Sequence, residues 1–252
     1  MSFKHALSLA HYNWPLYLIA LSGAIVGTVV ALNNHLSWTL RFTGALGALI
    51  AVWYAVASFL AFHVMFDRSR LLGGTWLHEM LPELPARCIQ ISVFLEATTL
   101  PLAKVFPQAE VILLNLFCPE LMTEPAVTRA RQSAKPTDAI SSAIDSLPVE
   151  DGWSDVTVVT LAAHEIRLAE KRQQLFRELQ RVTSVNGSII VVEHLRNVAA
   201  LLAFGPGLLH FYPRQEWLRL ARRTNLSLKD EIAITPFVHV FQFAPEQKST
   251  SP

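Results

Sequence analysis

Two long apolar runs open the chain, over residues 14–32 and 42–64, and neither contains a Lys, Arg, Asp or Glu. At about 1.5 Å per residue, the first run as a helix reaches about 28 Å, close to the hydrocarbon thickness of a bilayer. The polar residues 33–41 between the runs suffice only for a turn. The pattern therefore predicts a two-helix transmembrane hairpin over residues 1–66, with two buried helices of a soluble domain as the alternative. A cleaved signal peptide does not account for the second run.

The second half of the chain alternates between short β-rich runs and segments with helical periodicity. Strands are predicted at residues 87–94, 109–117, 155–161, 188–193, 226–234 and 237–243. Helices are predicted at residues 98–106, 168–182 and 213–224, the second of them closed by Asn186-Gly187 as a left-handed C-cap. This alternation predicts a doubly wound α/β domain over residues 87–245, preceded by a linker at 67–86 and followed by a disordered polar tail at 246–252.

Charge placement divides the chain at the same point. Only Lys4 and Arg41 carry a formal charge in the first 66 residues, and all 20 Asp and Glu lie at or after Asp67. From residue 67 onward the chain carries the remaining 19 of its 21 Lys and Arg together with all 20 Asp and Glu. This part has no surplus of basic residues, which excludes nucleic acid as a partner. The hydrophobic share of 52% and the charged share of 16% fit a chain that is partly in lipid.

The few basic residues beside the runs predict the orientation of the hairpin. Lys4, Arg68 and Arg70 flank it outside, whereas Arg41 lies in the turn. The positive-inside rule then places the amino terminus and the α/β domain in the cytoplasm, as a multi-pass protein of the inner (cytoplasmic) membrane with membrane lipid as a partner. Gly23 and Gly27 form a GxxxG pair, which predicts close packing within the hairpin or, as the alternative, a homodimer.

Four stretches follow one another in a characteristic order: DVTVVTLAAHEI, VNGSIIVVEHLRN, GPGLLHFYPRQEWLRLARRTNLSL and ITPFVHVFQF. Their order resembles the carboxy-terminal half of class I S-adenosylmethionine-dependent methyltransferases, in which strand four, a helix, strand five with an acidic end, a helix and an antiparallel strand pair succeed one another. The resemblance covers residues 155–244. It implies a seven-stranded, Rossmann-like sheet with S-adenosylmethionine as cofactor, here in a membrane-anchored branch.

The resemblance also implies three cofactor contacts, and the chain departs from each. Family members carry a glycine-rich turn after strand one, whereas QISVFLEA at residues 90–97 contains no glycine. A carboxylate ends strand two in the family, and Asn115 holds the matching position; the third carboxylate has its nearest equivalent in Asp145, two places out of register. We assign Ser92, Glu96, Asn115 and Asp145 as cofactor-binding candidates and expect weak or absent cofactor binding.

Candidate catalytic residues follow strands four and five, because doubly wound sheets bind ligands at the carboxyl ends of their strands. His164 and Glu165 follow the first of these strands, and Glu193 and His194 end the second. We assign His164, Glu165 and His194 as catalytic candidates, with His164 as the first choice of base and His194 as the second. The structural alternatives are a first-turn acid for Glu165 and a loop contact for His194.

Three further features bear on the function: the spacing of the His and Cys residues, an apolar loop and a basic segment. No metal site is expected, because the nine His include no HxxxH pair and neither cysteine has zinc spacing; both Cys88 and Cys118 should be free thiols. The apolar, Gly-rich loop at residues 204–212 is predicted to cover an acceptor pocket or to lie against lipid, and its His210 is either structural or catalytic. The polar segment at 122–135 is a surface helix or a basic face against anionic lipid headgroups.

Two functions remain open at this stage. The first is an enzyme that transfers a methyl group from S-adenosylmethionine to a lipophilic small molecule. The second is a catalytically inactive methyltransferase-like domain that serves as an accessory subunit of a membrane protein complex. Cofactor binding distinguishes them.

Overall fold

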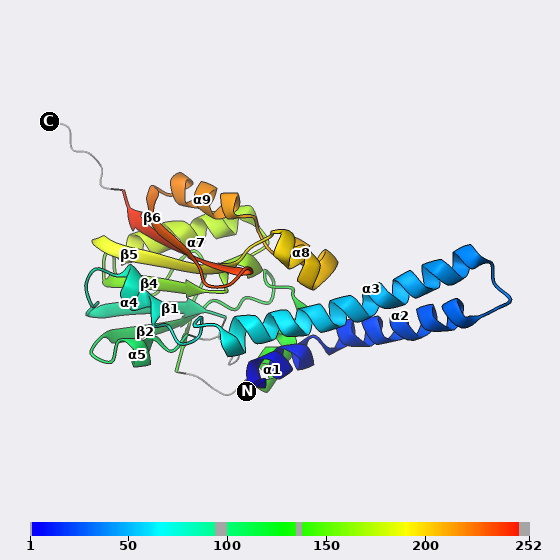
Figure 1. Cartoon of the computed structure of the whole chain (residues 1–252). Helices are drawn as coiled ribbons and strands as arrows, with labels where there is room; N and C mark the ends of the chain where they lie inside the picture. The colour runs from blue at the N-terminus through cyan, green and yellow to red at the C-terminus, as the bar shows by residue number, and fades with distance from the viewer. Residues whose placement is uncertain (1, 94–99, 135–137, 247–252) are drawn as a thin grey trace.

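The amino-terminal quarter of the chain is a long helical hairpin that extends away from an α/β domain (Figure 1). The computed structural model describes residues 2–93, 100–134 and 138–246. A short helix, α1 (Lys4–Tyr12), leads into α2 (Trp14–Leu32), and α3 (Trp38–Phe62) returns and ends in a π-helical turn, η1 (His63–Arg68). The two predicted runs are therefore helices, both long and apolar enough to cross a membrane, with a mean hydropathy of 2.1.

Small residues pack the hairpin together. A Cβ atom added to Gly27 would lie 2.5 Å from the carbonyl oxygen of Gly44, and one added to Gly23 would lie 3.7 Å from Cβ of Ala51. Both glycines of the GxxxG pair therefore face α3, as the packing interpretation expects. A homodimer through the same face would require α3 to move aside.

Seven strands form one mixed sheet in the order β3-β2-β1-β4-β5-β7-β6. The first five strands pair in parallel, and β7 runs antiparallel to both β5 and β6. This is the predicted doubly wound arrangement with an antiparallel strand pair at its end. The strands are β1 (Arg87–Ser92), β2 (Glu110–Asn115), β3 (Ile140–Ser141), β4 (Ser154–Thr160), β5 (Thr183–His194), β6 (Leu226–Ala233) and β7 (Val238–Pro245).

Helices cover both faces of the sheet because the central strands are buried on both sides. Helices α7 (Ala169–Val182) and α9 (Arg214–Arg223) pack through Phe176 and Trp217 on one face, against Ile189 and Val191 of β5. The opposite face contacts η1 and three short helices. These are α4 (Trp76–Met80), α5 (Leu102–Val105) and α8 (Val198–Phe204), while α6 (Pro125–Ser133) and the 3-10 turns η2 (Ala163–Glu165) and η3 (Gly205–His210) lie in the loops.

Residues 67–86, expected as a linker, are part of the packed domain. Leu71, Trp76 and Leu77 have no exposed surface and join the same hydrophobic cluster as the sheet. Asp67 binds the start of α1, because its carboxylate accepts hydrogen bonds from the backbone N–H groups of His5 and Ala6 at 3.0 and 3.1 Å. The hairpin is thereby fixed to the domain rather than tethered to it.

A second set of contacts joins the hairpin to α8. The indole Nε1 of Trp53 in α3 donates a hydrogen bond of 2.9 Å to the carbonyl oxygen of Leu202. At the next residue of α3, the ring of Tyr54 lies 2.9 Å from where a Cβ on Gly205 would stand, and Gly205 has a positive φ of 53°. Only glycine fits that position, because both the space and the backbone conformation exclude a side chain.

The predicted C-cap at Asn186-Gly187 is wrong. Helix α7 ends at Val182, and residues 183–187 already belong to β5, which pairs with β4 from Thr183 onward. Neither residue of the pair has a positive φ. Gly187 is required for space instead, since an added Cβ would lie 2.8 Å from the carbonyl oxygen of Asp155.

Replacing Gly187 with alanine is expected to lower the free energy of unfolding by about 1–3 kcal/mol, the usual cost of overpacking. The backbone oxygen of Asp155 cannot move away from the new methyl group without disturbing the pairing of β4 with β5. Urea unfolding of the detergent-solubilised protein measures the change. Gly73→Ala is the matched control, because its Cβ would meet only the Arg70 oxygen at an ordinary 3.5 Å; equal stability of the two variants would contradict the steric argument.

Both cysteines are free, as predicted. Cys88 is fully buried near the start of β1, and Cys118 follows β2 at the opposite end of these parallel strands. Burial, reinforced by the carboxylate of Asp155, raises the pKa of the Cys88 thiol to about 12, so it stays protonated.

Candidate active site

Strands β4 and β5 are parallel neighbours, so their carboxyl ends bring the two predicted catalytic segments together. Glu193, near the end of β5, is fully buried and organises the turn that follows β4. Its Oε1 accepts hydrogen bonds from the backbone N–H groups of Ala163 and His164 at 2.8 and 3.2 Å. Its Oε2 lies 2.6 Å from Nδ1 of His164. Glu193 therefore fixes both the backbone of η2 and the orientation of the His164 ring.

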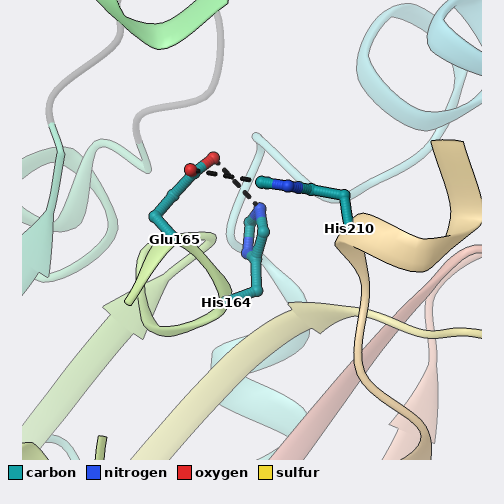
Figure 2. Close-up of side chains that lie close together, drawn as sticks. All are labelled: His164, Glu165 and His210. Carbon is teal, nitrogen blue, oxygen red and sulfur yellow. Dashed lines mark ion pairs between the residues drawn. The ribbon is translucent and has the colours of Figure 1, made fainter. Parts of the chain in front are cut away.

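Glu165 lies between two imidazole rings (Figure 2). Its Oε1 is 3.3 Å from Nε2 of His164, and its Oε2 is 3.4 Å from Nε2 of His210 in η3. Glu165 is only 6% exposed. On its other side, the His210 ring faces Glu124, with 3.7 Å between Nδ1 and Oε2. The sequence places His210 45 residues after Glu165, and only the fold of η3 over the sheet end brings them together.

The buried carboxylates control the charge of this cluster. Burial on its own opposes protonation of His164, but the carboxylates of Glu193 and Glu165 outweigh it and raise the pKa of His164 to about 10. Burial likewise opposes ionisation of Glu165, yet contacts with His164 and His210 hold the pKa of Glu165 well below its ordinary range. Both nitrogens of His164 face carboxylates, so the ring offers no free atom as a proton acceptor.

His194 has a different environment. Its ring packs against Phe211 with centroids 4.8 Å apart and meets Phe66 of η1 edge-on at 6.3 Å. Burial, reinforced by the rings of His164 and His210, lowers the pKa of His194 well below 6.5 and keeps the ring neutral. Within the described part of the chain, its buried Nδ1 has no hydrogen-bond partner. Unlike His164, His194 therefore has an uncharged ring that forms no ion pair among the described residues.

Two arginines hold the loop that carries His210. Arg196 donates to the carbonyl oxygens of Phe211 and Leu209 at 2.8 and 2.9 Å. Arg167 donates to the carbonyl oxygen of His210 at 2.7 Å. These bonds hold the backbone of residues 209–211 over the ends of β4 and β5. The position of the His210 ring beside Glu165 is thereby fixed. No linear signal points to Glu124 as the neighbour of His210.

Comparisons with known proteins agree with this architecture. Residues 97–191 match the family described as a methyltransferase domain. An S-adenosylmethionine-dependent methyltransferase from Aquifex aeolicus superposes with a TM-score of 0.53 at 12% identity, covering 72% of this chain and 90% of that one. One from Methanosarcina mazei gives 0.51 at 14% identity, with 68% and 97% covered. The domain has a methyltransferase-like fold. No curated protein matches the sequence.

Both of these solved proteins are described as S-adenosylmethionine-dependent methyltransferases. The predicted contacts lie at the ends of β1 and β2, where Ser92 and Asn115 are partners in the sheet register. Ser92 is buried, and Glu96 lies outside the described residues.

Arg131 of α6 occupies the space between these two strand ends. Its Nη1 donates to the carbonyl oxygen of Val93 at 2.8 Å and to Oδ1 of Asn115 at 3.3 Å. The guanidinium also stacks over the ring of Phe117, 4.1 Å from its centroid. Asn115 Oδ1 accepts a second hydrogen bond from the backbone N–H of Phe117. The basic segment at 122–135 thus directs one arginine inward, which neither the surface-helix nor the lipid interpretation predicts.

A pocket of about 320 Å³ lies between the loops that follow β2 and β3. Phe117, Leu121 and Ile144 form its apolar part, and Asp145 stands at its rim in an ion pair with Lys171. Of the predicted cofactor-binding residues, Asp145 lines this pocket, whereas Asn115 accepts a hydrogen bond from Arg131.

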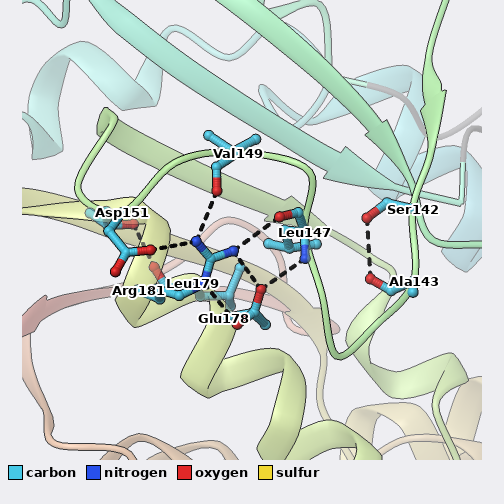
Figure 3. A network of polar contacts seen from close by, with 9 residues as sticks. Ser142, Ala143, Leu147, Val149, Asp151, Glu178, Leu179 and Arg181 are labelled. Carbon is cyan, nitrogen blue, oxygen red and sulfur yellow. Dashed lines mark hydrogen bonds and ion pairs between the residues drawn. The ribbon is translucent and has the colours of Figure 1, made fainter.

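The loop that bears Asp145 is held rigidly by Arg181 of α7 (Figure 3). Its guanidinium donates to the carbonyl oxygens of Leu147 and Val149 at 3.0 and 2.8 Å. Glu178 completes the clamp by accepting from the Leu147 backbone N–H at 2.8 Å. The carboxylates of Glu178 and Asp151 raise the pKa of Arg181, so the clamp stays charged. The segment at residues 147–151 therefore has a structural anchor that the sequence does not reveal.

Proposed function

We propose that the chain is a membrane-anchored methyltransferase that transfers a methyl group from S-adenosylmethionine to a lipophilic small molecule. The observation that carries the proposal is the buried cluster of His164, Glu165, Glu193 and His194 at the carboxyl ends of β4 and β5. It lies directly beneath an apolar segment, α8 and η3, that is attached to the hairpin.

Membrane anchoring is supported by the exposure of the hairpin. Within their most apolar windows, α2 and α3 are 0% and 6% buried, which disfavours the interpretation as core helices of a soluble domain. Leu16, Ile19 and Leu49 expose 63%, 68% and 66% of their surface. So many exposed apolar side chains are stable only in lipid or against another protein.

Segment α8–η3 supports a lipophilic acceptor. Val198, Leu202 and Leu209 are 72%, 54% and 60% exposed, next to the part of α3 that carries Trp53 and Tyr54. An apolar segment beside a membrane helix lies in the interfacial layer of the bilayer. An acceptor dissolved in the membrane would thus reach the site along α8.

In this mechanism the cofactor supplies an activated methyl group on a sulfonium centre. Glu193 and Glu165 hold the His164 ring in one orientation, so it forms a fixed wall of the site beside the ring of His194. His194 takes the acceptor proton on its unpartnered Nδ1, while Phe66 and Phe211 exclude water around the ring.

The direct test is methyl transfer by the full-length protein in detergent, with S-adenosylmethionine labelled in its methyl group and a lipid extract as acceptor pool. Label that moves into the organic phase only with active protein supports the proposal. Failure to transfer label, together with failure to bind the cofactor, would overturn it.

The position of Arg131 favours a second candidate function, an inactive domain that serves as an interaction subunit. In this case the guanidinium between Val93 and Asn115 would be a permanent replacement for the cofactor. Titration of the Arg131→Ala variant with S-adenosylmethionine distinguishes the enzyme from the interaction subunit.

Arg131→Ala is expected to strengthen S-adenosylmethionine binding about tenfold or more, equivalent to about 1.4 kcal/mol. The change removes a cation from the site of a cationic ligand and frees Asn115 Oδ1. Calorimetry on the detergent-solubilised protein measures both dissociation constants, and we expect the unchanged chain to bind more weakly than about 1 μM. Arg129→Ala is the control on the same helix, because Arg129 instead contacts the Tyr12 carbonyl of α1. No binding by either form at millimolar cofactor would favour the interaction subunit.

The orientation of the hairpin gives a further prediction. Cysteine at Asn34, in the hairpin turn, should react with an impermeant thiol reagent in intact cells, whereas cysteine at the exposed Lys229 of β6 should react only after lysis. Cys118→Ser removes the partly exposed background thiol, and the buried Cys88 stays unreactive. The reverse labelling pattern would contradict a cytoplasmic domain.

A further inference from the structure

His164, Glu165 and His210 meet in a pattern that goes beyond acid-base chemistry. One ligand atom of each lies within 4.8 Å of the others (Figure 2). Two of the separations are 3.3 Å, from His164 Nε2 to Glu165 Oε1, and 3.4 Å, from His210 Nε2 to Glu165 Oε2. Two ligand atoms that bind one tetrahedral zinc ion at about 2.0–2.1 Å are separated by about 3.4 Å. Both separations, one to each oxygen of Glu165, are close to that value, and the ligand atoms of all three residues lie within 4.8 Å of one another.

Carboxylates stand behind both imidazoles. Glu193 Oε2 holds Nδ1 of His164 at 2.6 Å, and Glu124 Oε2 faces Nδ1 of His210 at 3.7 Å. Such carboxylates orient metal-bound histidines and increase their basicity. Because Nδ1 of each ring is directed to a carboxylate, Nε2 of each ring is directed inward.

The inward atoms are buried and incompletely bonded. Glu165 Oε2 and His210 Nε2 are inaccessible to solvent and, within the described residues, have no contact that meets hydrogen-bond geometry; they share only their mutual ion pair at 3.4 Å. Buried polar atoms ordinarily form full hydrogen bonds, so a loose pair at the centre of a cluster leaves coordination capacity for a further group.

The charge of the cluster points the same way. Glu165 and Glu193 are 6% and 0% exposed, and among the described residues no Lys or Arg forms an ion pair with either. Their charged neighbours are imidazoles. A divalent cation between the rings would neutralise two buried carboxylates that the chain itself balances only through histidines.

We propose that His164, Glu165 and His210 bind one divalent transition-metal ion, with Glu193 and Glu124 as the carboxylates that orient the two histidines. Two imidazoles and one carboxylate favour zinc, iron or cobalt over magnesium and calcium, which prefer oxygen ligands. Three protein ligands leave a position open for water or an acceptor oxygen, as in catalytic metal sites. The expectation of no metal site considers only ligands close in sequence, whereas His210 comes from a separate loop.

The test uses the full-length protein in detergent, freed of metal with a chelator and then titrated with Zn²⁺ by calorimetry. We expect one Zn²⁺ per chain with a dissociation constant in the micromolar range or tighter, and a higher thermal midpoint in its presence. Co²⁺ as a second probe should give the visible spectrum of a nitrogen and oxygen site without thiolate bands, which separates this site from binding at Cys118. Neither readout depends on methyl transfer, so the metal site and the proposed function fail independently.

Variants locate the ion. His210→Ala and Glu165→Gln should each weaken Zn²⁺ binding about 100-fold or more, and Glu124→Gln about tenfold, as for other orienting carboxylates. His239→Ala is the matched control, because His239 also pairs with a carboxylate, Glu231 at 2.8 Å, but belongs to no group of three ligands among the described residues. Glu124 lies at the surface of the cluster, so Glu124→Gln remains informative if a central variant fails to fold. Absence of saturable binding, or binding unchanged in all three variants, would overturn the proposal.

Discussion

Glu193→Ala should lower the free energy of unfolding by about 3–5 kcal/mol, the cost of leaving one member of a buried charged pair without its partner. The substitution removes the acceptor of two backbone N–H groups, on Ala163 and His164, and of the His164 ring. Each buried donor left without a partner costs about 1–3 kcal/mol. For a domain of this size, the midpoint of thermal unfolding should fall by roughly 6–20 °C.

Thermal and urea unfolding of the full-length protein in detergent measure this effect. Glu79→Ala is the matched control, because Glu79 is a carboxylate whose side chain is 58% exposed and pairs with Arg70 at the surface. An exposed pair of this kind contributes about 0–1 kcal/mol. Glu193→Gln should have an intermediate effect, since its amide oxygen still accepts from the backbone while the charge is lost. If Glu193→Ala and Glu79→Ala unfold alike, Glu193 does not organise the turn.

Replacing His194 with asparagine should reduce the rate of methyl transfer about 10²–10⁴-fold, the usual contribution of a general base. Asparagine is polar and smaller, and its side chain cannot take up a proton at neutral pH. Because His194 lies beyond the cofactor pocket residues, the dissociation constant of S-adenosylmethionine should stay unchanged. A fall in kcat without loss of cofactor binding therefore separates a chemical role from a folding defect.

The control for this variant is His35→Ala. His35 is an exposed histidine in the hairpin turn, at the end of the molecule remote from the sheet (Figure 1). It should leave the rate unchanged. Equal rates of methyl transfer for His194→Asn and the unchanged protein would show that His194 is not the general base.

The fold was predictable because its signals are local. Apolar runs without charge predict α2 and α3, and alternating strands and helices predict a doubly wound sheet with all of its strands except the two-residue β3. The failures occur where tertiary contacts override local preference. Asn186-Gly187 has the composition of a helix cap, yet it lies in β5 because the strand pairs with β4 from Thr183 onward. Residues 67–86, predicted as a linker, are packed because Trp76 and Leu77 complete the hydrophobic core, and their local sequence pattern does not indicate this.

The candidate site was predictable in part for a related reason. His164, Glu165 and His194 follow strands whose carboxyl ends must meet, and the structure brings them together. Asp145 stands apart in the pocket rim. His210 and Arg131 reach their positions through loops, and sequence alone does not specify where a loop turns back.

The continuous path of α3 gives the anchor a mechanical role. The helix runs without a break from Trp38 into η1, where the ring of Phe66 packs edge-on against the ring of His194. Earlier in the same helix, Trp53 and Tyr54 contact the segment of α8 and η3 that leads to His210. In the proposed membrane-anchored form, a change in the tilt of the hairpin, as imposed by thinner or thicker bilayers through hydrophobic mismatch, would therefore act on both sides of the cluster at once. Acyl-chain length in reconstituted vesicles thus becomes a control variable for the geometry of the site.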